Sequence, residues 1–182
     1  MPRSQKPDRE SLPYRDCAGI ALFNRRGQVF IGRRRAEDDP EDNAERGAPW
    51  QMPQGGIDKG EAPLAAARRE LFEETSVRSA RLIAEAPDWI HYDLPDDALG
   101  IALKGKYRGQ RQRWFAFLFE GDDSEIDVIE PGDGAMPSEF DAWRWEELSR
   151  TPDLIVAFKR DAYEQIVAAF GHLPRQLAQP EP

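Results

Sequence analysis

Apolar residues in this chain fall into short runs between turn signals, and only near the C-terminal end do they recur with a helical period. Runs of this length are typical of buried strands. Residues 17–23 and 28–34 flank the turn signal Asn24-Arg25-Arg26-Gly27, which predicts a β-hairpin. Further strands are expected at residues 79–86, 89–93, 111–119, 126–129 and 142–145.

Two helices are predicted, one in the middle of the chain and one near its end. The first covers about residues 62–75, with Pro63 in the first turn, where a missing N–H is no loss. The second covers residues 154–170, whose apolar positions follow helical spacing. This order of elements suits an α/β fold with a mixed sheet between helices. We expect a mobile N-terminal tail, one domain and a C-terminal tail, at residues 1–13, 14–172 and 173–182.

The first helix carries a cluster of carboxylates. Glu70, Glu73 and Glu74 stand at i, i+3 and i+4 and therefore share one sector of the helix, beside an apolar stripe that can pack on a core. Carboxylates this close repel one another, and oxygen-rich sites of this kind suit hard divalent ions such as Mg²⁺. Arg69 stands four positions before Glu73 and can orient it. The alternative is a solvated helix face with incidental ion pairs.

The spacing of these residues resembles the Nudix box. Gly55 is followed after five residues by Glu61, and seven residues later by Arg69-Glu70-Leu71, any residue, Glu73-Glu74, any residue, and Ser76-Val77. The family has glycine at the position of Ser76, and every other specified position matches. So many fixed positions are far more specific than a lone glycine motif. The resemblance implies an α/β/α sandwich that hydrolyses nucleoside diphosphates linked to another moiety.

Charge and composition limit the partners. The formal net charge is −9, which disfavours broad, non-specific binding of nucleic acid through phosphates. It does not exclude recognition of one terminal phosphate group by a metal and a few arginines. Much of the acid lies in residues 35–48, which are expected to form a solvated loop, whereas residues 95–109 form a candidate substrate loop. With no apolar run near the roughly 20 residues that span a bilayer and no secretory start, we expect a cytoplasmic protein.

Segments outside the box are similar to bacterial RNA 5′-pyrophosphohydrolases, a subfamily also described as dinucleoside polyphosphate hydrolases. They are scattered over most of the chain, at residues 14–15, 50–57, 109–115, 139–145 and 158–160. The chain departs from the subfamily at Asp16, where proline is common, in the acidic loop and at Ser76. The resemblance implies Mg²⁺ or Mn²⁺ as cofactor, and a 5′-triphosphorylated RNA or a dinucleoside polyphosphate as substrate.

The resemblance also implies roles for individual residues. The metal would be held by Gly55, through its carbonyl, and by Glu70, Glu73, Glu74 and Glu139. Glu70 is the first candidate for the group that deprotonates water, and Glu139 is the alternative. The catalytic residues expected on this basis are Glu70, Glu139 and Arg69.

The substrate-binding residues implied by the resemblance are Arg15, Arg34, Gln54, Tyr92, Gln110, Phe158 and Lys159. Guanidinium groups match phosphate oxygens in a bidentate way, which suits Arg15 and Arg34 to the 5′ phosphates. Phe158 either stacks on a base or belongs to the core of the C-terminal helix, and Lys159 approaches phosphate. Tyr92 and Gln110 each have an ordinary structural alternative.

The sequence therefore predicts a metal-dependent pyrophosphohydrolase that converts 5′-triphosphorylated RNA to 5′-monophosphorylated RNA and also splits dinucleoside polyphosphates. Binding of DNA or of a membrane is not expected, and the oligomeric state is left open. Two alternatives stand beside this one. The first is a hydrolase of another nucleoside diphosphate derivative, such as ADP-ribose or a nucleotide sugar. The second is a non-catalytic nucleotide-binding module, which would be expected to lose acidic box residues that this chain keeps.

Overall fold

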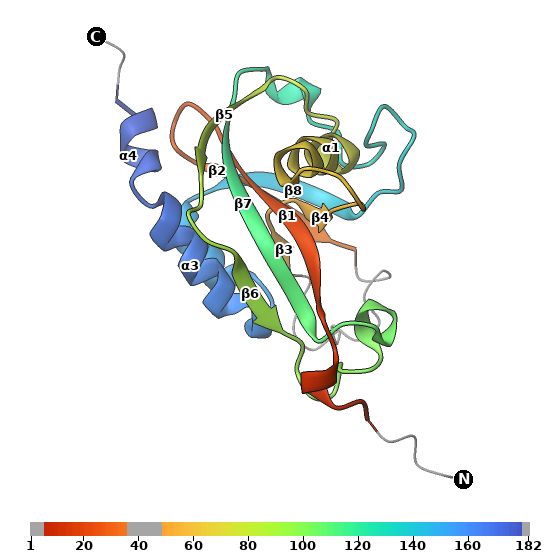
Figure 1. Ribbon diagram of the computed structural model, residues 1–182. Helices are drawn as coiled ribbons and strands as arrows, with labels where there is room; N and C mark the ends of the chain where they lie inside the picture. The colour runs from red at the N-terminus through yellow and green to blue at the C-terminus, as the bar shows by residue number, and fades with distance from the viewer. Residues whose placement is uncertain (1–5, 36–48, 180–182) are drawn as a thin grey trace.

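The computed structural model describes residues 6–35 and 49–179, which form one mixed sheet with helices on both faces (Figure 1). The strands are β1 (Tyr14–Phe23), β2 (Val29–Arg34), β3 (Trp50–Gln51), β4 (Gln54–Gly56), β5 (Ala80–Glu85), β6 (Ile90–Asp93), β7 (Gly109–Phe119) and β8 (Phe140–Glu146). The main order is β3-β2-β1-β7-β5, while β4 pairs with β1, β6 with β7 and β8 with β2. Only β1 and β7 among these pairs run parallel.

The helices form the outer layers. Helix α1 (Pro63–Thr75) lies on one face of the sheet, and α3 (Arg160–Phe170) lies on the other, with the short α4 (Leu173–Leu177) beyond it (Figure 1). A further short helix, α2 (Thr151–Leu154), precedes α3, and 3₁₀ turns lie at Arg9–Ser11, Ala102–Gly105, Asp123–Glu125, Leu148–Arg150 and Ala157–Lys159. The predicted α/β/α sandwich with a mixed sheet is confirmed.

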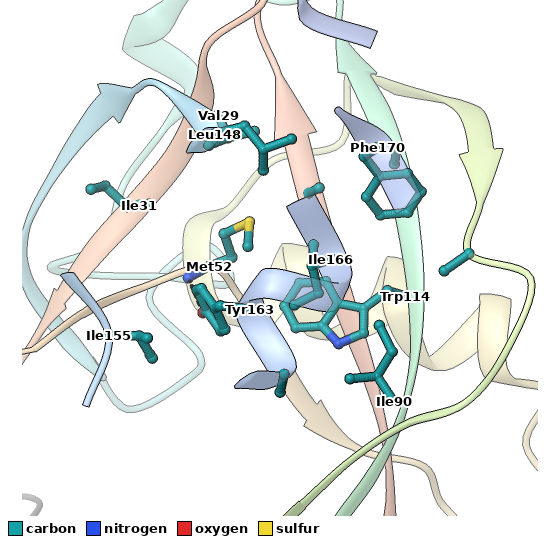
Figure 2. Close-up of a cluster of buried hydrophobic side chains, with 14 of the residues drawn as sticks. Val29, Ile31, Met52, Ile90, Trp114, Leu148, Ile155, Tyr163, Ile166 and Phe170 are labelled. Atoms are coloured by element: carbon teal, nitrogen blue, oxygen red, sulfur yellow. Dashed lines mark hydrogen bonds between the residues drawn. The ribbon is translucent and has the colours of Figure 1, made fainter. Parts of the chain in front are cut away.

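The alternation of side chains along the central strands divides the core into two layers. On β1, Ile20 and Leu22 pack on the α1 side, whereas Ala21 and Phe23 pack on the α3 side. The α3 layer is drawn in Figure 2, where Trp114 of β7 lies against Ile166 and Tyr163 of α3. The hydroxyl of Tyr163 accepts a hydrogen bond from the backbone N–H of Met52 at 2.9 Å. This bond ties α3 to the segment that leads into the glycine loop.

The predicted helix over residues 154–170 is wrong at its beginning. Helix α2 ends at Leu154, Ile155 is extended, a 3₁₀ turn covers Ala157–Lys159, and α3 begins at Arg160. The apolar spacing persists across the break because Ile155 and Val156 are buried in the same core layer as α3. The helical spacing of apolar residues therefore continues across the break between α2 and α3, although the chain there is not one helix.

Residues 126–129, predicted as a short strand, have no strand partner. Ile126 and Val128 are buried under α1 while Ile129 is 55% exposed, so the alternation reflects burial of a loop. In contrast, β3 and β4 were not predicted, because segments of two or three residues carry no readable period.

Both predicted tails contain structure. Near the N-terminus, Arg9 lies in a 3₁₀ turn and forms an ion pair with Asp96 at 2.7 Å. Near the C-terminus, Leu173 is buried and Pro174 lies so close to Gly27 that a Cβ there would stand 2.4 Å from the Pro174 carbonyl oxygen. Almost all of the predicted acidic loop at residues 35–48 lies outside the described residues. Within the described parts, no helix has both the length and the apolar character needed to cross a membrane.

Candidate active site

Arg69, in the middle of α1, is the centre of a hydrogen-bond network between the helix and the glycine loop. Its Nε and Nη2 donate to the two carboxylate oxygens of Glu61 at 2.9 and 2.8 Å, a bidentate pair. Its Nη1 donates to Glu70 at 2.8 Å and to Glu73 at 3.0 Å. Nη2 also donates to the carbonyl oxygen of Gly56 at 2.8 Å. One guanidinium thus links the glycine loop to the carboxylates of the helix, a geometry that the fork of arginine permits and a lysine cannot reproduce.

Glu61 is held in its charged form by this network. The hydrogen bonds from Arg69, followed by a hydrogen bond from the backbone N–H of Asp58, lower the pKa of Glu61 to about 2. The side chain also closes the turn that leads into α1, since that N–H lies 3.0 Å from its Oε1. Glu61 is therefore an orienting group, not a proton acceptor near neutral pH.

The two glycines leave room for functional side chains. A Cβ on Gly55 would lie 2.1 Å from the carboxylate carbon of Glu70, and a Cβ on Gly56 would lie 2.4 Å from Nη2 of Arg15. Any other residue at either position would push a candidate metal ligand or phosphate ligand aside. Strand β4 is anchored here by pairing with β1, in which Gly55 stands opposite Ala18. The two glycines therefore allow the side chains of Glu70 and Arg15 to lie directly against the backbone of the loop.

Glu74 has an environment unlike that of its neighbours. It is 3% exposed, and within the described part of the chain neither of its carboxylate oxygens makes a hydrogen bond of normal geometry. Burial raises the pKa of Glu74 well above its usual value, and the carboxylates of Glu139 and Glu70 raise it further. Burial also raises the pKa of Glu70, while the guanidinium of Arg69 opposes that shift. These carboxylates are close enough to repel one another when all are charged.

This donor set fits a divalent cation. An orphaned, buried carboxylate beside two others is costly unless a positive charge neutralises it. Oxygen-only donors match the preference of Mg²⁺ and similar hard ions. In the described residues, no three acidic, imidazole or thiol groups converge as closely as ligands around an ion do, and Glu70 instead faces Arg69.

A cleft of about 560 Å³ opens beside this acidic cluster. All seven residues expected to bind substrate line it, together with Gly55, Glu70 and Glu139. These seven are Arg15, Arg34, Gln54, Tyr92, Gln110, Phe158 and Lys159. Arg69, Glu73 and Glu74 do not line the cleft: Arg69 and Glu73 belong to the network at its edge, and Glu74 is buried. The cleft therefore combines carboxylates with cationic and aromatic groups.

The aromatic and cationic part of the cleft is built from β6 and the 3₁₀ turn before α3. The ring centroids of Tyr92 and Phe158 lie 5.7 Å apart, and the Lys159 ammonium lies 5.2 Å from the Tyr92 ring and 5.8 Å from the Phe158 ring. Lys159 is only 9% exposed, so its charge is held near the cleft. Phe158 packs against the core and also lines the cleft, so the two expectations for it are not exclusive.

Some residues of the cleft were not identified individually from the sequence. Leu94, Ile101, Ala102 and Leu103 form part of its wall, and the last three belong to the expected substrate loop at residues 95–109. Ile101 is 62% exposed, which is unusual for an isoleucine. The only signal in the sequence was that this segment is long, irregular and rich in glycine and basic residues.

The NUDIX domain family matches residues 13–166 of the chain. The RNA pyrophosphohydrolase of Mesorhizobium japonicum is 59% identical over 175 residues, which cover 96% of this chain and 100% of that protein. The RNA pyrophosphohydrolase of Rhizobium meliloti is 60% identical over 168 residues, or 91% of this chain and 98% of that protein. Among solved structures, the E. coli dihydroneopterin triphosphate pyrophosphohydrolase has a TM-score of 0.60 at 20% identity, covering 86% of this chain and 98% of that one, a likeness of fold alone. The chain belongs to the Nudix family, as its glycine loop and acidic helix predicted.

Proposed function

We propose that this protein is a pyrophosphohydrolase that converts 5′-triphosphorylated RNA to 5′-monophosphorylated RNA and releases pyrophosphate. The observation that carries the proposal is the cleft in which Arg15, Arg34 and Lys159 lie together with Glu70 and Glu139. A 5′-triphosphate needs both sets of groups: cations to bind its oxygens, and carboxylates to hold the metal and the attacking water. The relatives named RNA pyrophosphohydrolase support the choice of RNA, since their similarity covers nearly the whole chain.

Nudix hydrolases generally use divalent metal ions, and we propose Mg²⁺ or Mn²⁺ here. The ligands would be the carboxylates of Glu70, Glu73, Glu74 and Glu139, with the carbonyl of Gly55. When bound, such an ion neutralises the phosphate oxygens and lowers the pKa of a bound water. The raised pKa of Glu74 supports its inclusion, as does the lack of a hydrogen-bond partner for its oxygens among the described residues.

The protein's own side chains would bind and orient the substrate phosphates and take a proton from the attacking water. Arg15 and Arg34 hold the terminal phosphates, and Lys159 neutralises charge on the leaving pyrophosphate. A general base works best when its pKa lies near the working pH. Burial raises the pKa of Glu70, which favours Glu70 over the exposed Glu139 as the group that takes the proton from water.

The nucleoside end of the substrate would lie against the aromatic wall. Phe158 offers a ring on which the first base stacks, and base–aromatic stacking contributes about 1–3 kcal/mol per base. Stacking on one base is tolerant of sequence, so the same cleft would accept the nucleoside end of a dinucleoside polyphosphate as a second substrate. We place this activity in the cytoplasm.

A comparison of turnover on defined substrates tests the proposal. Triphosphorylated RNA, diadenosine tetraphosphate and ADP-ribose are incubated with the protein at equal Mg²⁺, and the products are identified. We expect release of pyrophosphate from RNA to be fastest, and a clear preference for ADP-ribose would support the alternative nucleoside diphosphate hydrolase. Ligand binding with Mg²⁺ but no turnover of any substrate would support the non-catalytic module.

Two matched variants separate the roles of the carboxylates. Glu70→Gln and Glu139→Gln both remove a charge at the cleft, while Glu147→Gln removes an exposed charge just beyond the opposite end of β8. Loss of the general base typically costs about 10²- to 10⁴-fold in rate. We expect this loss for Glu70→Gln, a smaller loss for Glu139→Gln and none for Glu147→Gln. If Glu70→Gln kept full activity, the proposed role of Glu70 would be wrong.

A further inference from the structure

A second hollow opens directly beside the cleft. It has a volume of about 450 Å³ and is lined by Arg15, Leu103, Lys104, Lys106 and Tyr107. Arg15 and Leu103 line both the hollow and the cleft, so these two side chains border both spaces. The remaining three residues of the hollow belong to the connection between β6 and β7. Figure 1 shows that connection, with its short green helical turn, beside the beginnings of β1 and β7.

The hollow is cationic although the protein is strongly acidic. From Ala98 to Phe119 the chain carries five basic side chains and no acidic one, against a formal net charge of −9 for the whole protein. The three arginines in this segment are already neutralised by nearby carboxylates, in the pairs Arg108 with Asp93, Arg111 with Asp16, and Arg113 with Glu85. In contrast, Lys104 and Lys106 are exposed and form no ion pair with any carboxylate in the described residues. Their charges are available to a phosphate.

The backbone that carries Lys104 is held in an unusual shape. Leu103 and Lys104 both have left-handed conformations, with φ of 53° and 58°, and Gly100 and Gly105 are left-handed as well. A non-glycine residue in this region is uncommon and costs about 1 kcal/mol or more. The turn is closed tightly, because a Cβ on Gly105 would stand 2.6 Å from the carbonyl oxygen of Gly100. Strain of this kind tends to be kept at ligand-binding sites, where it fixes side-chain direction.

We propose that this hollow binds the RNA chain that follows the 5′ end. The inference rests on the proposed function: with the triphosphate in the cleft and held by Arg15, the next nucleotides leave over Leu103 into the hollow. Lys104 and Lys106 contact backbone phosphates there, and Tyr107 supplies an aromatic surface for a base. A dinucleoside polyphosphate has no chain to place in the hollow, so the hollow favours RNA over that class of substrate.

The length of the substrate provides the test. Steady-state kinetics are measured on a triphosphorylated dinucleotide and a triphosphorylated dodecanucleotide that share their first two nucleotides. The double variant Lys104→Asn with Lys106→Gln removes both charges, and asparagine tolerates the left-handed backbone at residue 104. We expect the KM of the dodecanucleotide to rise roughly fivefold to tenfold and that of the dinucleotide to stay within about twofold.

The salt dependence of affinity for the long RNA is a second readout. It would not change if Lys104 and Lys106 had only a structural role. Each phosphate contact on a single strand contributes about 0.7 to the slope of log affinity against log salt, so the double variant should lower the slope for the long substrate by about 1.4. A variant with arginine at both positions keeps the charges and should keep the wild-type slope. The matched control is Arg25→Gln with Arg26→Gln, which removes two exposed charges at the turn after β1, at the opposite end of that strand from Arg15.

The outcomes separate the inference from the function on which it rests. If the wild-type protein released no pyrophosphate from either RNA, the proposed function would fail. If it hydrolysed both but with the same KM and salt slope, or if the lysine variant changed both substrates equally, the RNA path through the hollow would be refuted. An equal effect of the Arg25 and Arg26 control would show a general loss of charge and would also overturn the path.

Discussion

Replacing Glu74 with glutamine is expected to stabilise the protein while no divalent cation is bound. Glu74 is 3% exposed, its two oxygens lack hydrogen-bond partners in the described part of the chain, and Glu139 and Glu70 lie close to it. Glutamine keeps the size of the side chain and removes the charge. The variant therefore loses the repulsion without opening a cavity.

The magnitude follows from the cost of leaving such a group unpaired. A buried polar group without a partner costs about 1–3 kcal/mol, and more when it is charged. The amide of glutamine recovers part of this cost, because its N–H groups can donate to Glu70 or Glu139. We expect a gain of about 1–2 kcal/mol in the free energy of unfolding, or a rise in Tm of roughly 2–8 °C for a domain of this size.

The sign of the pH dependence is also fixed. The folded protein raises the pKa of Glu74, so the folded state binds this proton more tightly than the unfolded chain does. The stabilising contribution of the protonated group is fully present below the unfolded pKa, about 4.3, and is lost as the pH rises from there toward the raised folded pKa. The advantage of the variant in Tm should therefore grow from acidic pH toward neutral pH.

The assay is thermal unfolding in EDTA and in saturating Mg²⁺. An ion at 100 times its Kd stabilises the folded state by about 2.7 kcal/mol, so Mg²⁺ should raise the Tm of the wild type and have a much smaller effect on Glu74→Gln. Glu73→Gln is the matched control in EDTA, since the Glu73 carboxylate is paired with Arg69 and should gain nothing from neutralisation. A Glu74→Gln protein less stable than wild type in EDTA, or stabilised equally by Mg²⁺, would refute the reasoning.

Three more predictions concern the box. Gly55→Ala should displace the Glu70 carboxylate, which lies 2.1 Å from the new Cβ, and lower kcat about 100-fold while thermal melts change little; unchanged kcat would contradict the close approach. Ser76→Gly should preserve activity and raise the free energy of unfolding by between zero and about 1 kcal/mol, because relief of left-handed strain is partly offset by a more flexible unfolded chain; a clear loss in urea unfolding would speak against it. Since Arg69 lowers the pKa of Glu61 to about 2, the stability from this pair should be lost as the pH falls from about 4.3 toward 2, and Arg69→Lys should flatten that acid limb in pH-dependent melts.

The sequence was most informative where a local rule determines the structure. Pro63 marked the beginning of α1 to within one residue, since proline suits the first helical turn. The family position of Ser76 raised the possibility of a left-handed residue, and the structure shows it there with φ of 63° and ψ of 7°. The hydroxyl of Ser76 also accepts a long hydrogen bond of 3.4 Å from the backbone N–H of Asp133, a contact that no local rule predicts.

The environment of the carboxylates could be predicted only in part. Helical spacing placed Glu70, Glu73 and Glu74 on one sector, but it could not distinguish the buried Glu74 from Glu73 paired with Arg69. That difference arises because the sheet covers one edge of the sector, which depends on how α1 lies on β1 and β4. Tertiary packing decides burial, and periodicity gives only the direction in which each side chain leaves the helix.

The layout of the cleft shows the same division between local and tertiary information. The family resemblance predicted Arg15, Gln110 and Lys159, from three distant segments, as substrate-binding residues. In the folded protein, the pairing of β1 with β7 brings Arg15 opposite Gln110. The left-handed turn at Leu103 and Lys104 could not be read from the sequence, because nothing in their residue types favours positive φ. The hollow beside the cleft therefore emerges only from the folded chain.

Product identification during turnover of triphosphorylated RNA tests the central claim most directly. A short RNA with a 5′-triphosphate is incubated with the protein and Mg²⁺, and the phosphorus-31 NMR spectrum is followed to completion. The account predicts that pyrophosphate and a 5′-monophosphorylated RNA appear together in equal amounts, and that Glu70→Gln slows the appearance of both by about 10²- to 10⁴-fold. Successive release of orthophosphate through a diphosphorylated RNA, or no reaction at all, would contradict it.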